Sequence, residues 1–283
     1  MSQQPSLGTS PNPAVASRGG QANEAGSLYR NGVAAYLATH GLAGRGVEAA
    51  GYAEKGPAPV RLAFETGEAV DDIRCELSNG TVLRVQAKLE CGNNRHLAAT
   101  VAQWAGEVHS LRPGDMVGLA TGQPKGPVRE LGRALDRRRR SVPGSHPAGE
   151  RAALAAPRRR FPAGTPDEVA DRVLQSAFVM VVAASSPREE GFRSVANLLD
   201  GTVVAPGSGS AAIEALQRAF QEQAALGAGS EVGDWLRVLA HLTVSPDDAG
   251  TTGPGRRAGL GAATAQRGIR RRHPGAVVRR APN

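Results

Sequence analysis

Residues 71–88 read DDIRCELSNGTVLRVQAK, and the prediction of the fold starts from this segment. Two strands are expected in it, one on each side of the turn signal SNG. Side chains alternate between the two faces of a strand. The apolar face takes Ile73, Cys75, Leu77, Leu83, Val85 and Ala87, and the polar face takes Asp72, Arg74, Glu76, Arg84, Gln86 and Lys88. Each strand therefore has one face for a hydrophobic core and one polar face.

The length of the turn decides whether the two polar faces coincide. A two-residue turn would place Asp72 opposite Ala87, and the acid would then point into the apolar face. A three-residue loop places Asp72 opposite Gln86 instead, and it needs a left-handed residue at its last position, where Gly80 stands. We therefore predict the three-residue loop, with Lys88 one diagonal step from Asp72 on the same face.

An acid, an amide and an amine thus converge at one end of the predicted hairpin. The carboxylate of Asp72 and the amide oxygen of Gln86 are ligands that Mg²⁺ accepts, and the backbone carbonyl of Ala87 is a candidate third ligand. Such an ion polarises a phosphodiester and lowers the pKa of a bound water. Lys88 can orient or deprotonate that water, or stabilise the charge that develops on the phosphorane. Only three of the 34 basic residues are lysine, and arginine is a poor proton acceptor because its pKa is too high.

The preceding strand is expected to bring a further acid, Glu65 or Glu68, close to this cluster. For Glu65 an ordinary surface carboxylate is an equally good interpretation. His96 follows the second strand of the hairpin closely, but a lone histidine is more often incidental than functional. For the whole polar face, the plain alternative is a solvated surface of an ordinary hairpin.

Periodicity predicts an α/β protein along the rest of the chain. The expected elements are a helix at 27–40, strands at 60–65, 70–77 and 81–88, a helix at 94–110, a strand at 115–120 and a helix at 127–140; beyond them come a helix at 165–176, a buried strand at 177–184 and helices at 208–226 and 230–241. The expected organisation is a disordered tail at 1–25, a first domain at 26–140, a linker at 141–150, a mostly helical region at 151–250 and an arginine-rich disordered tail at 251–283.

The net charge of +8 resides in the C-terminal tail. Residues 254–283 hold eight arginines and no acid, which leaves 26 basic and 26 acidic residues in the rest of the chain. The tail either contacts phosphates non-specifically or reflects a bias toward arginine codons. The run RRRR at 137–140 ends a helix, where cations are favourable, and DNA contact is an equal alternative. We expect no membrane span, no secretory signal and no zinc site for the two cysteines, hence a cytoplasmic protein.

The motif resembles the PD-(D/E)XK nuclease superfamily, which has an acid, a hairpin and a lysine at the end of the next strand. Gln86-Ala87-Lys88 is similar to the Q-x-K form of its Mrr-like branch. The wider segments GSLYRNGVAAYL, FETGEAVDDI, VQAK and TVAQW resemble the dsDNA-nuclease domain of bacterial anti-phage effectors, over roughly residues 26–140. The resemblance implies a restriction-endonuclease-like αβββαβ core, with Asp72 and Gln86 as metal ligands, Lys88 as the catalytic lysine and Glu65 as an upstream acid. Glutamine replaces the commoner glutamate, which implies weaker metal binding.

The sequence therefore predicts a bacterial Mg²⁺-dependent deoxyribonuclease acting on double-stranded DNA. A defence role is implied by the resemblance alone. The C-terminal region is expected to serve regulation, a sensor or regulatory partner, or homodimer contacts. The rival hypothesis is a non-catalytic module on the same fold that binds nucleic acid or protein.

Overall fold

The hairpin lies at the centre of a mixed sheet with the strand order β5-β4-β3-β2-β1-β6. The computed structural model describes residues 13–64, 70, 72–92, 95–107, 109–140, 147–159, 161, 163–184 and 186–243. Its strands are β1 (Pro59–Ala63), β2 (Ile73–Leu77), β3 (Val82–Cys91), β4 (Met116–Pro124), β5 (Ala177–Val181) and β6 (Gly229–Glu231). Strands β6, β1, β2 and β3 pair antiparallel, whereas β4 and β5 run parallel to β3. The predicted α/β class is confirmed.

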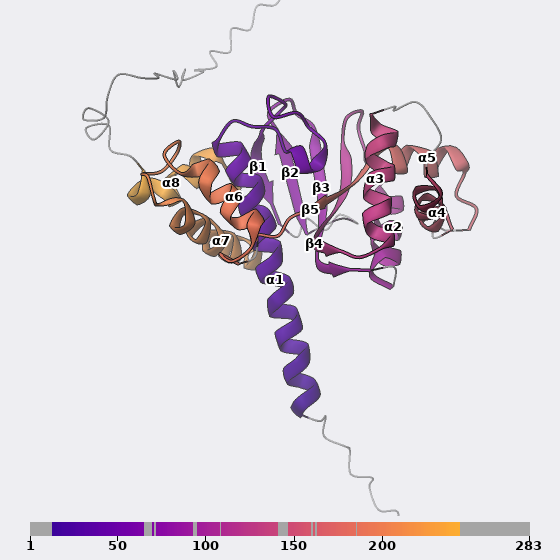
Figure 1. The fold of residues 1–283 in the computed structure, drawn as a ribbon, viewed down its shortest axis with the longest axis horizontal. Coiled ribbons are helices and arrows are strands. Elements are labelled where there is room, and N and C mark those ends of the chain that lie inside the picture. Colours follow the sequence, from indigo (N-terminus) through magenta and orange to yellow (C-terminus); the bar gives the residue numbers. More distant parts are fainter. Residues whose placement is uncertain are drawn as a thin grey trace, which may run out of the picture. The chain divides into compact units, whose positions relative to one another are not determined.

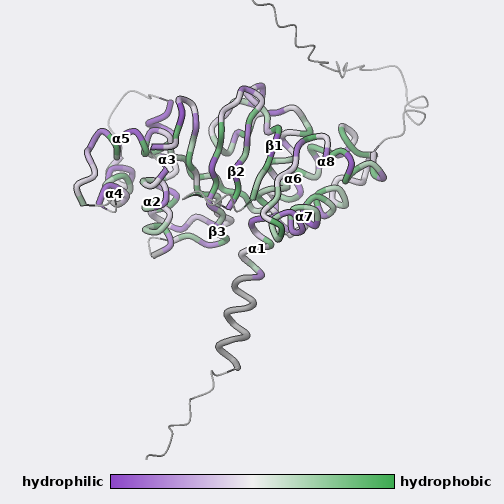
Figure 2. Tube along the Cα trace, turned by 180° about the vertical axis from the view of Figure 1, so that it is seen from behind, coloured by the Kyte–Doolittle hydropathy of each residue, from purple (hydrophilic) through white to green (hydrophobic). Residues whose placement is uncertain are grey.

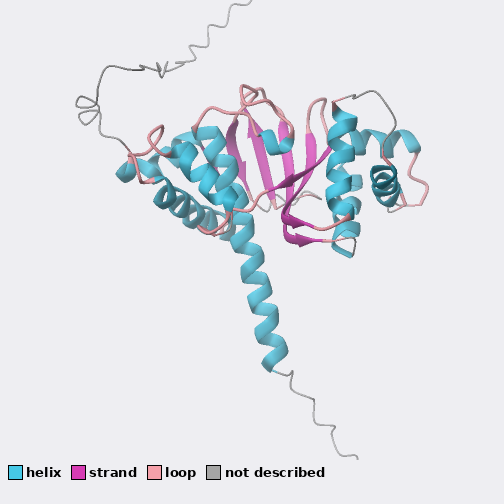
Figure 3. Cartoon of the chain, in the orientation of Figure 1, coloured by secondary structure: helices cyan, strands magenta, loops and turns pink. Residues whose placement is uncertain are grey.

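Helices cover both faces of this sheet, as Figures 1 and 3 show. The helices are α1 (Pro13–Leu42), α2 (Arg95–Glu107), α3 (Pro127–Arg139), α4 (Ala148–Arg158), α5 (Asp167–Ser176), α6 (Glu190–Leu199), α7 (Gly209–Ala225) and α8 (Val232–Leu239), with short 3₁₀ turns η1 (Glu48–Ala50) and η2 (Ala240–Leu242). The order from α1 to β4 is the predicted αβββαβ. Among the described helices, none has the length and apolar content that crossing a bilayer requires.

The register of the hairpin is the predicted one. Ile73 pairs with Val85 and Cys75 with Leu83 across β2 and β3. Gly80, at the end of the loop, has a φ of 84°. The three-residue loop is therefore confirmed, and it places the polar side chains of both strands on one face.

Each face of the sheet has its own hydrophobic core. On one side the apolar residues of the hairpin pack beneath α1, α6, α7 and α8, around Phe64, Phe220 and Trp235. On the other side α2, α3, α4 and α5 pack against β4 around Trp104 and Leu131. Figure 2 shows hydrophobic and hydrophilic residues alternating along α7, as an amphipathic helix requires. On the polar face of the hairpin Arg84 and Gln86 are buried, whereas Asp72 and Lys88 are partly exposed.

The first helix begins earlier than expected. Residues 13–25, assigned to a disordered tail, continue α1 toward the N-terminus. Pro13 stands at the first helical position, where its fixed φ suits a helix and its missing N–H costs nothing. The segment has no apolar stripe, so periodicity could not reveal it. Residues 1–12 lie outside the described residues.

The C-terminal region belongs to the same compact unit as the hairpin. It supplies β5 and β6, the two edge strands of the sheet, and was expected to be a separate, mostly helical region. Helix α4 begins at Ala148, inside the linker expected at 141–150. Its early acid, Glu150, is buried and bonds to Arg137 on α3 at 3.0 Å. The strand expected at 177–184 is confirmed as β5, whereas the three-residue β6 and the Arg137–Glu150 pair leave no local pattern in a sequence. The tail expected at 251–283 lies outside the described residues.

Gly80 provides a direct test of the register. A Cβ at this position would meet nothing within 4 Å, so Gly80→Ala costs only the left-handed backbone conformation, about 1 kcal/mol of the free energy of unfolding. Gly80→Asn should cost less, since asparagine tolerates this region. Urea unfolding measures both. Gly233→Ala is the control, because Gly233 is also unobstructed but helical, and it should not destabilise the protein. Equal stability of Gly80→Ala and wild type would contradict the assigned loop.

Candidate functional site

The predicted site residues meet at the end of the hairpin that lies away from its turn. Asp72 stands directly before β2, and its Oδ2 atom accepts hydrogen bonds from Gln86 Nε2 at 2.5 Å and from the backbone N–H of Ala87 at 2.8 Å. Lys88 Nζ lies 4.0 Å from the same oxygen. The structure thus brings together the three side chains that the sequence predicted, with the acid held against the strand that carries the amide and the amine.

The three side chains differ sharply in exposure. Gln86 is 2% exposed, whereas the Lys88 side chain is 37% exposed and that of Asp72 22%. Gln86 Oε1 is buried and has no hydrogen-bond partner among the described residues. A buried acceptor without a partner costs free energy, so this oxygen is suited to a ligand or a cation. The amine, by contrast, reaches solvent.

These groups fit the hard cation that the resemblance implies. Half a rotation of the Gln86 amide exchanges Nε2 with Oε1, and an amide oxygen then faces the carboxylate of Asp72. The N–H and C=O of one strand residue point to the same side of the strand. The carbonyl of Ala87 therefore faces the segment of Asp72, as its N–H does. Oxygen ligands of these three kinds are those that Mg²⁺ takes.

The site is poor in acids. Among the described residues, no group of three or more His, Cys, Asp or Glu side chains could hold a metal ion. Glu65, the predicted upstream ligand, lies outside the described residues, as do Glu68 and Asp71. Both cysteines are free and buried, and burial raises the pKa of the Cys75 thiol.

An open hollow of about 610 Å³ surrounds the site. It is lined by Ala25, Gly26, Ser27 and Arg30 from α1, by Asp72, by Ala87, Lys88, Leu89 and Glu90 from β3, and by His96 from α2. His96, expected to be incidental, thus lies beside the predicted site, and so does Arg30, which the sequence did not mark. No local motif marks either residue, because the fold brings their helices to the same end of β3.

A buried ionic network holds the segment that carries Asp72. Glu107, at the end of α2, accepts a hydrogen bond from the backbone N–H of Val70 at 3.3 Å. The same carboxylate pairs with Arg84 of β3 at 3.3 Å, and Arg84 also pairs with Asp115 at 3.4 Å. All three charged residues are at most 5% exposed. Buried charges need partners, and here the partners join the strand of Gln86 to the residue two places before Asp72.

The arginine run at 137–140 has partners within the fold. Arg137 pairs with Glu150 and Arg138 with Asp171. Arg139 donates to the carbonyl of Ala50 at 2.6 Å, and Arg140 pairs with Asp136 at 3.1 Å. The first three contacts tie α3 to its neighbours, and the fourth lies within the end of α3. The run therefore has a structural role, and the DNA-contact alternative finds no support in this geometry.

Comparison with known proteins gives an approximate likeness in fold and no match in sequence. No protein-family model matches the chain, and no curated protein matches it by sequence. A Cap4 SAVED/CARF-domain containing receptor from Acinetobacter baumannii with the cyclic trinucleotide 3′3′3′-cAAA has a TM-score of 0.49 at 11% identity, over 76% of this chain and 44% of that one. The Moraxella osloensis Cap4 receptor has a TM-score of 0.48 at 8% identity, over 76% and 48%. The chain therefore spans less than half the length of these proteins, and a likeness of this size assigns no function to it.

The buried network generates a prediction about the Asp72 segment. Glu107→Ala leaves Arg84 buried with fewer partners and should lower the free energy of unfolding by about 3–5 kcal/mol. It also removes the acceptor of the Val70 N–H, so hydrogen exchange of residues 70–77 should accelerate. Urea unfolding and exchange mass spectrometry measure the two effects. Glu107→Gln keeps an acceptor and should exchange more slowly than the alanine variant.

Glu150→Ala is the matched control for this experiment. Glu150 is 4% exposed and also pairs with an arginine, Arg137, but this pair joins α4 to α3, whereas the Glu107 pair joins α2 to β3. The Glu150→Ala variant should be less stable than wild type, but hydrogen exchange at residues 70–77 should not become faster. Unchanged exchange in Glu107→Ala would show that the network does not hold the Asp72 segment.

Proposed function

We propose that this protein is a Mg²⁺-dependent nuclease that hydrolyses phosphodiester bonds of double-stranded DNA. The observation that carries the proposal is the arrangement around Asp72 Oδ2, which has the amide of Gln86 at 2.5 Å and the amine of Lys88 at 4.0 Å, at the wall of an open hollow. An ordinary solvated hairpin would leave its amide exposed and its amine unpaired. The resemblance to PD-(D/E)XK nucleases at the same three positions supports the same chemistry.

Each residue has a separate task in this chemistry. Asp72, the amide oxygen of Gln86 and the carbonyl of Ala87 would hold the cation. When bound, Mg²⁺ supplies polarisation of the phosphodiester and a bound water of lowered pKa. Lys88, with its amine near the carboxylate but reaching solvent, orients that water, takes its proton or neutralises charge that develops on the phosphate oxygens.

The biological setting of the proposal comes from the resemblance to anti-phage effectors. It places the nuclease in bacterial defence, switched on by a sensor or regulatory partner. The chain spans less than half of the Cap4 receptors that it matches, so the partner and the activating signal belong to the proposal and not to the observed fold.

A second candidate, a non-catalytic binding module on the same fold, is favoured by one observation. The described residues place no group of three metal-ligating side chains at Asp72 or elsewhere, and Gln86 contributes a neutral ligand where an acid is commoner. Such a module would bind nucleic acid, a nucleotide or a protein in the hollow at Lys88 without cleaving it.

Plasmid cleavage separates the two candidates. Asp72→Asn and Lys88→Ala should each lower Mg²⁺-dependent cleavage at least about a hundredfold, because the first removes a charged ligand of the metal and the second removes the amine that acts on the metal-bound water. EDTA should abolish cleavage by wild type. Lys88→Arg keeps the charge but is a poor proton acceptor, so its activity distinguishes proton transfer from charge stabilisation. Lys55→Ala, an exposed lysine outside the site, is the control and should cleave normally. Equal cleavage by Lys88→Ala and wild type would end the catalytic assignment, and duplex binding without cleavage would favour the second candidate.

Gln86→Glu tests the metal site without relying on activity. Without metal, a second carboxylate beside Asp72 Oδ2 introduces like-charge repulsion, so the variant should melt at a lower temperature than wild type in EDTA. With Mg²⁺ the added charge strengthens ion binding, and the variant should gain more in melting temperature than wild type does. Differential scanning fluorimetry across a Mg²⁺ titration measures both shifts. A variant that gains no more from Mg²⁺ than wild type would argue against a cation between these two side chains.

A further inference from the structure

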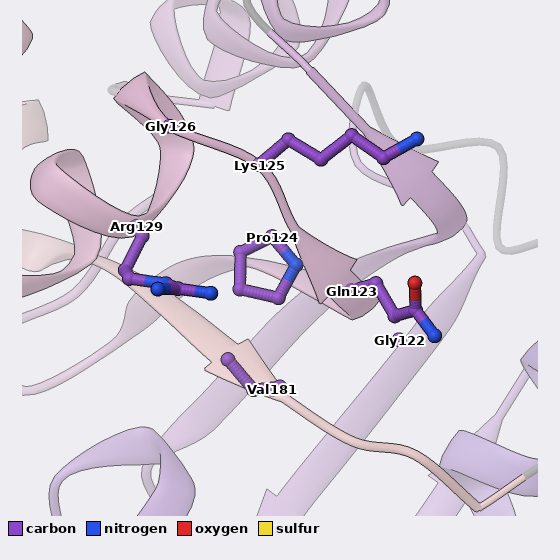
Figure 4. Close-up of a pocket in the computed structure, with 7 residues that line it drawn as sticks. All are labelled: Gly122, Gln123, Pro124, Lys125, Gly126, Arg129 and Val181. Atoms are coloured by element: carbon purple, nitrogen blue, oxygen red, sulfur yellow. The ribbon is translucent and has the colours of Figure 1, made fainter.

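A second open hollow, of about 640 Å³, lies where β4 ends and α3 begins (Figure 4). Its lining consists of Gly122, Gln123, Pro124, Lys125, Gly126, Arg129 and Val181. Figure 4 shows the Arg129 side chain pointing toward Pro124, and the Lys125 side chain extending away from Arg129. The lining contains two cations and no carboxylate, in a chain that is electrically neutral outside its C-terminal tail.

Both cations are available to an external anion. Arg129 is exposed and has no ion-pair partner in the described part of the chain. Lys125 pairs with Glu90 at 3.1 Å, but the two side chains are 63% and 69% exposed. Exposed pairs of this kind are worth little free energy, so Lys125 can exchange Glu90 for a phosphate at small cost.

The cationic hollow is linked to the candidate catalytic site through lining residues that neighbouring hollows share. The hollow at Lys88 shares Leu89 and Glu90 with a middle hollow, and the middle hollow shares Gly122 and Gln123 with the cationic one. The three therefore adjoin along the carboxyl ends of β3 and β4.

The strand register gives the scale of this path. Lys88 pairs with Thr121 across the parallel strands, and Lys125 follows Thr121 by four residues, a rise of about 13 Å in extended chain. That distance corresponds to about four nucleotide steps along a DNA duplex. A duplex whose scissile phosphodiester lies at Lys88 would therefore bring other phosphates to the cationic hollow.

We infer that Lys125 and Arg129 bind backbone phosphates of double-stranded DNA, a few nucleotides from the bond that the proposed nuclease cleaves. The apolar floor formed by Pro124 and Val181, the latter 53% exposed, suits the non-polar face of a deoxyribose. The middle hollow carries Glu90 and also Glu189 and Glu190, so the duplex bridges it and does not enter it. The inference names the substrate path of the proposed function and rests on that function for the position of the scissile bond.

The test measures binding in EDTA, where cleavage plays no part. Full-length Lys125→Ala/Arg129→Ala and wild type are titrated with a fluorescent duplex over a series of NaCl concentrations, and anisotropy gives the association constant. Each cation that contacts a phosphate adds about 0.9 to the slope of log K against log salt. The double variant should therefore lose about 1.8 from this slope, and about tenfold or more in affinity at low salt. The arginine-rich tail contributes equally to both proteins and cancels in the difference.

Lys55→Ala/Arg218→Ala is the matched control, since it also removes one exposed lysine and one exposed arginine. Lys55 lies shortly after η1, in the segment that also contains Tyr52. The Tyr52 hydroxyl donates a hydrogen bond to Met116 at the amino end of β4, which is the end away from the cationic hollow. This variant should keep the wild-type slope within about 0.5. If the salt slope fell equally in both double variants, the loss of net charge alone would explain the weaker binding, and the inference would be wrong.

Glu90→Gln tests the inference in the opposite direction. It frees Lys125 and removes a negative charge from the path, so duplex affinity should rise about threefold or more. Weaker binding by this variant would contradict a DNA path along the three hollows.

The outcomes keep the inference and the proposed function apart. If wild type cleaves plasmid and the Lys125/Arg129 double variant keeps the full salt slope, the inference is wrong and the nuclease stands. If wild type binds but never cleaves, and the slope falls by about 1.8, the nuclease is wrong and the cationic hollow stands. If wild type does not bind duplex DNA at all, the inference is wrong.

Discussion

The contact between Asp72 and the main chain of β3 is the interaction on which the site depends. The N–H of Ala87 donates to the carboxylate, so the acid is fixed to the strand that carries Gln86 and Lys88 and not merely close to it. This contact exists only in one register, because a slip by one residue turns every side chain of a strand to the other face. The left-handed glycine at position 80 thus helps to fix which side chains meet at the far end of the hairpin.

A second constraint comes from charge buried beneath α2. Arg84 lies on the same face as Gln86 and is 5% exposed, which is unfavourable unless it is paired. Glu107 and Asp115 provide the pairing, and Glu107 also holds Val70. The cost of burying an arginine is therefore offset by contacts that order the approach to Asp72. A well-packed apolar core would stabilise this region equally well but could not connect α2 to that segment.

The sequence predicted the parts of this arrangement that are local and missed those that are not. The hairpin register follows from two alternating strands and one glycine, so Asp72, Gln86 and Lys88 could be placed together before any fold was known. Glu107 accepts a hydrogen bond from the backbone N–H of Val70, which lies 37 residues earlier in the chain. No residue spacing in the sequence indicates a partner at that distance. The strand expected at 177–184 exists as β5 (Ala177–Val181), but its place at the edge of this sheet depends on pairing with a distant strand, β4, which spacing does not reveal. Strand β6 was not expected, since it is only three residues long. The helical turns before residue 26 have no apolar stripe, so only composition was available to predict their structure. Composition indicated a disordered tail, and residues 13–25 are helical.

Several arginines of this chain and two of its lysines occupy different kinds of position. Arginines at 84 and 137–140 pair with acids or carbonyls inside the fold, as expected of a planar group that binds in fixed geometries. Two of the three lysines, Lys88 and Lys125, instead lie where the parallel neighbours β3 and β4 end. Flexible, strongly hydrated ammonium groups suit phosphates that arrive, react and leave. The nuclease and the binding module would share this cationic edge. The two proposals differ in whether the oxygens of Asp72 and Gln86 take up a cation, and the nuclease proposal requires the amide oxygen of Gln86 to face the carboxylate of Asp72.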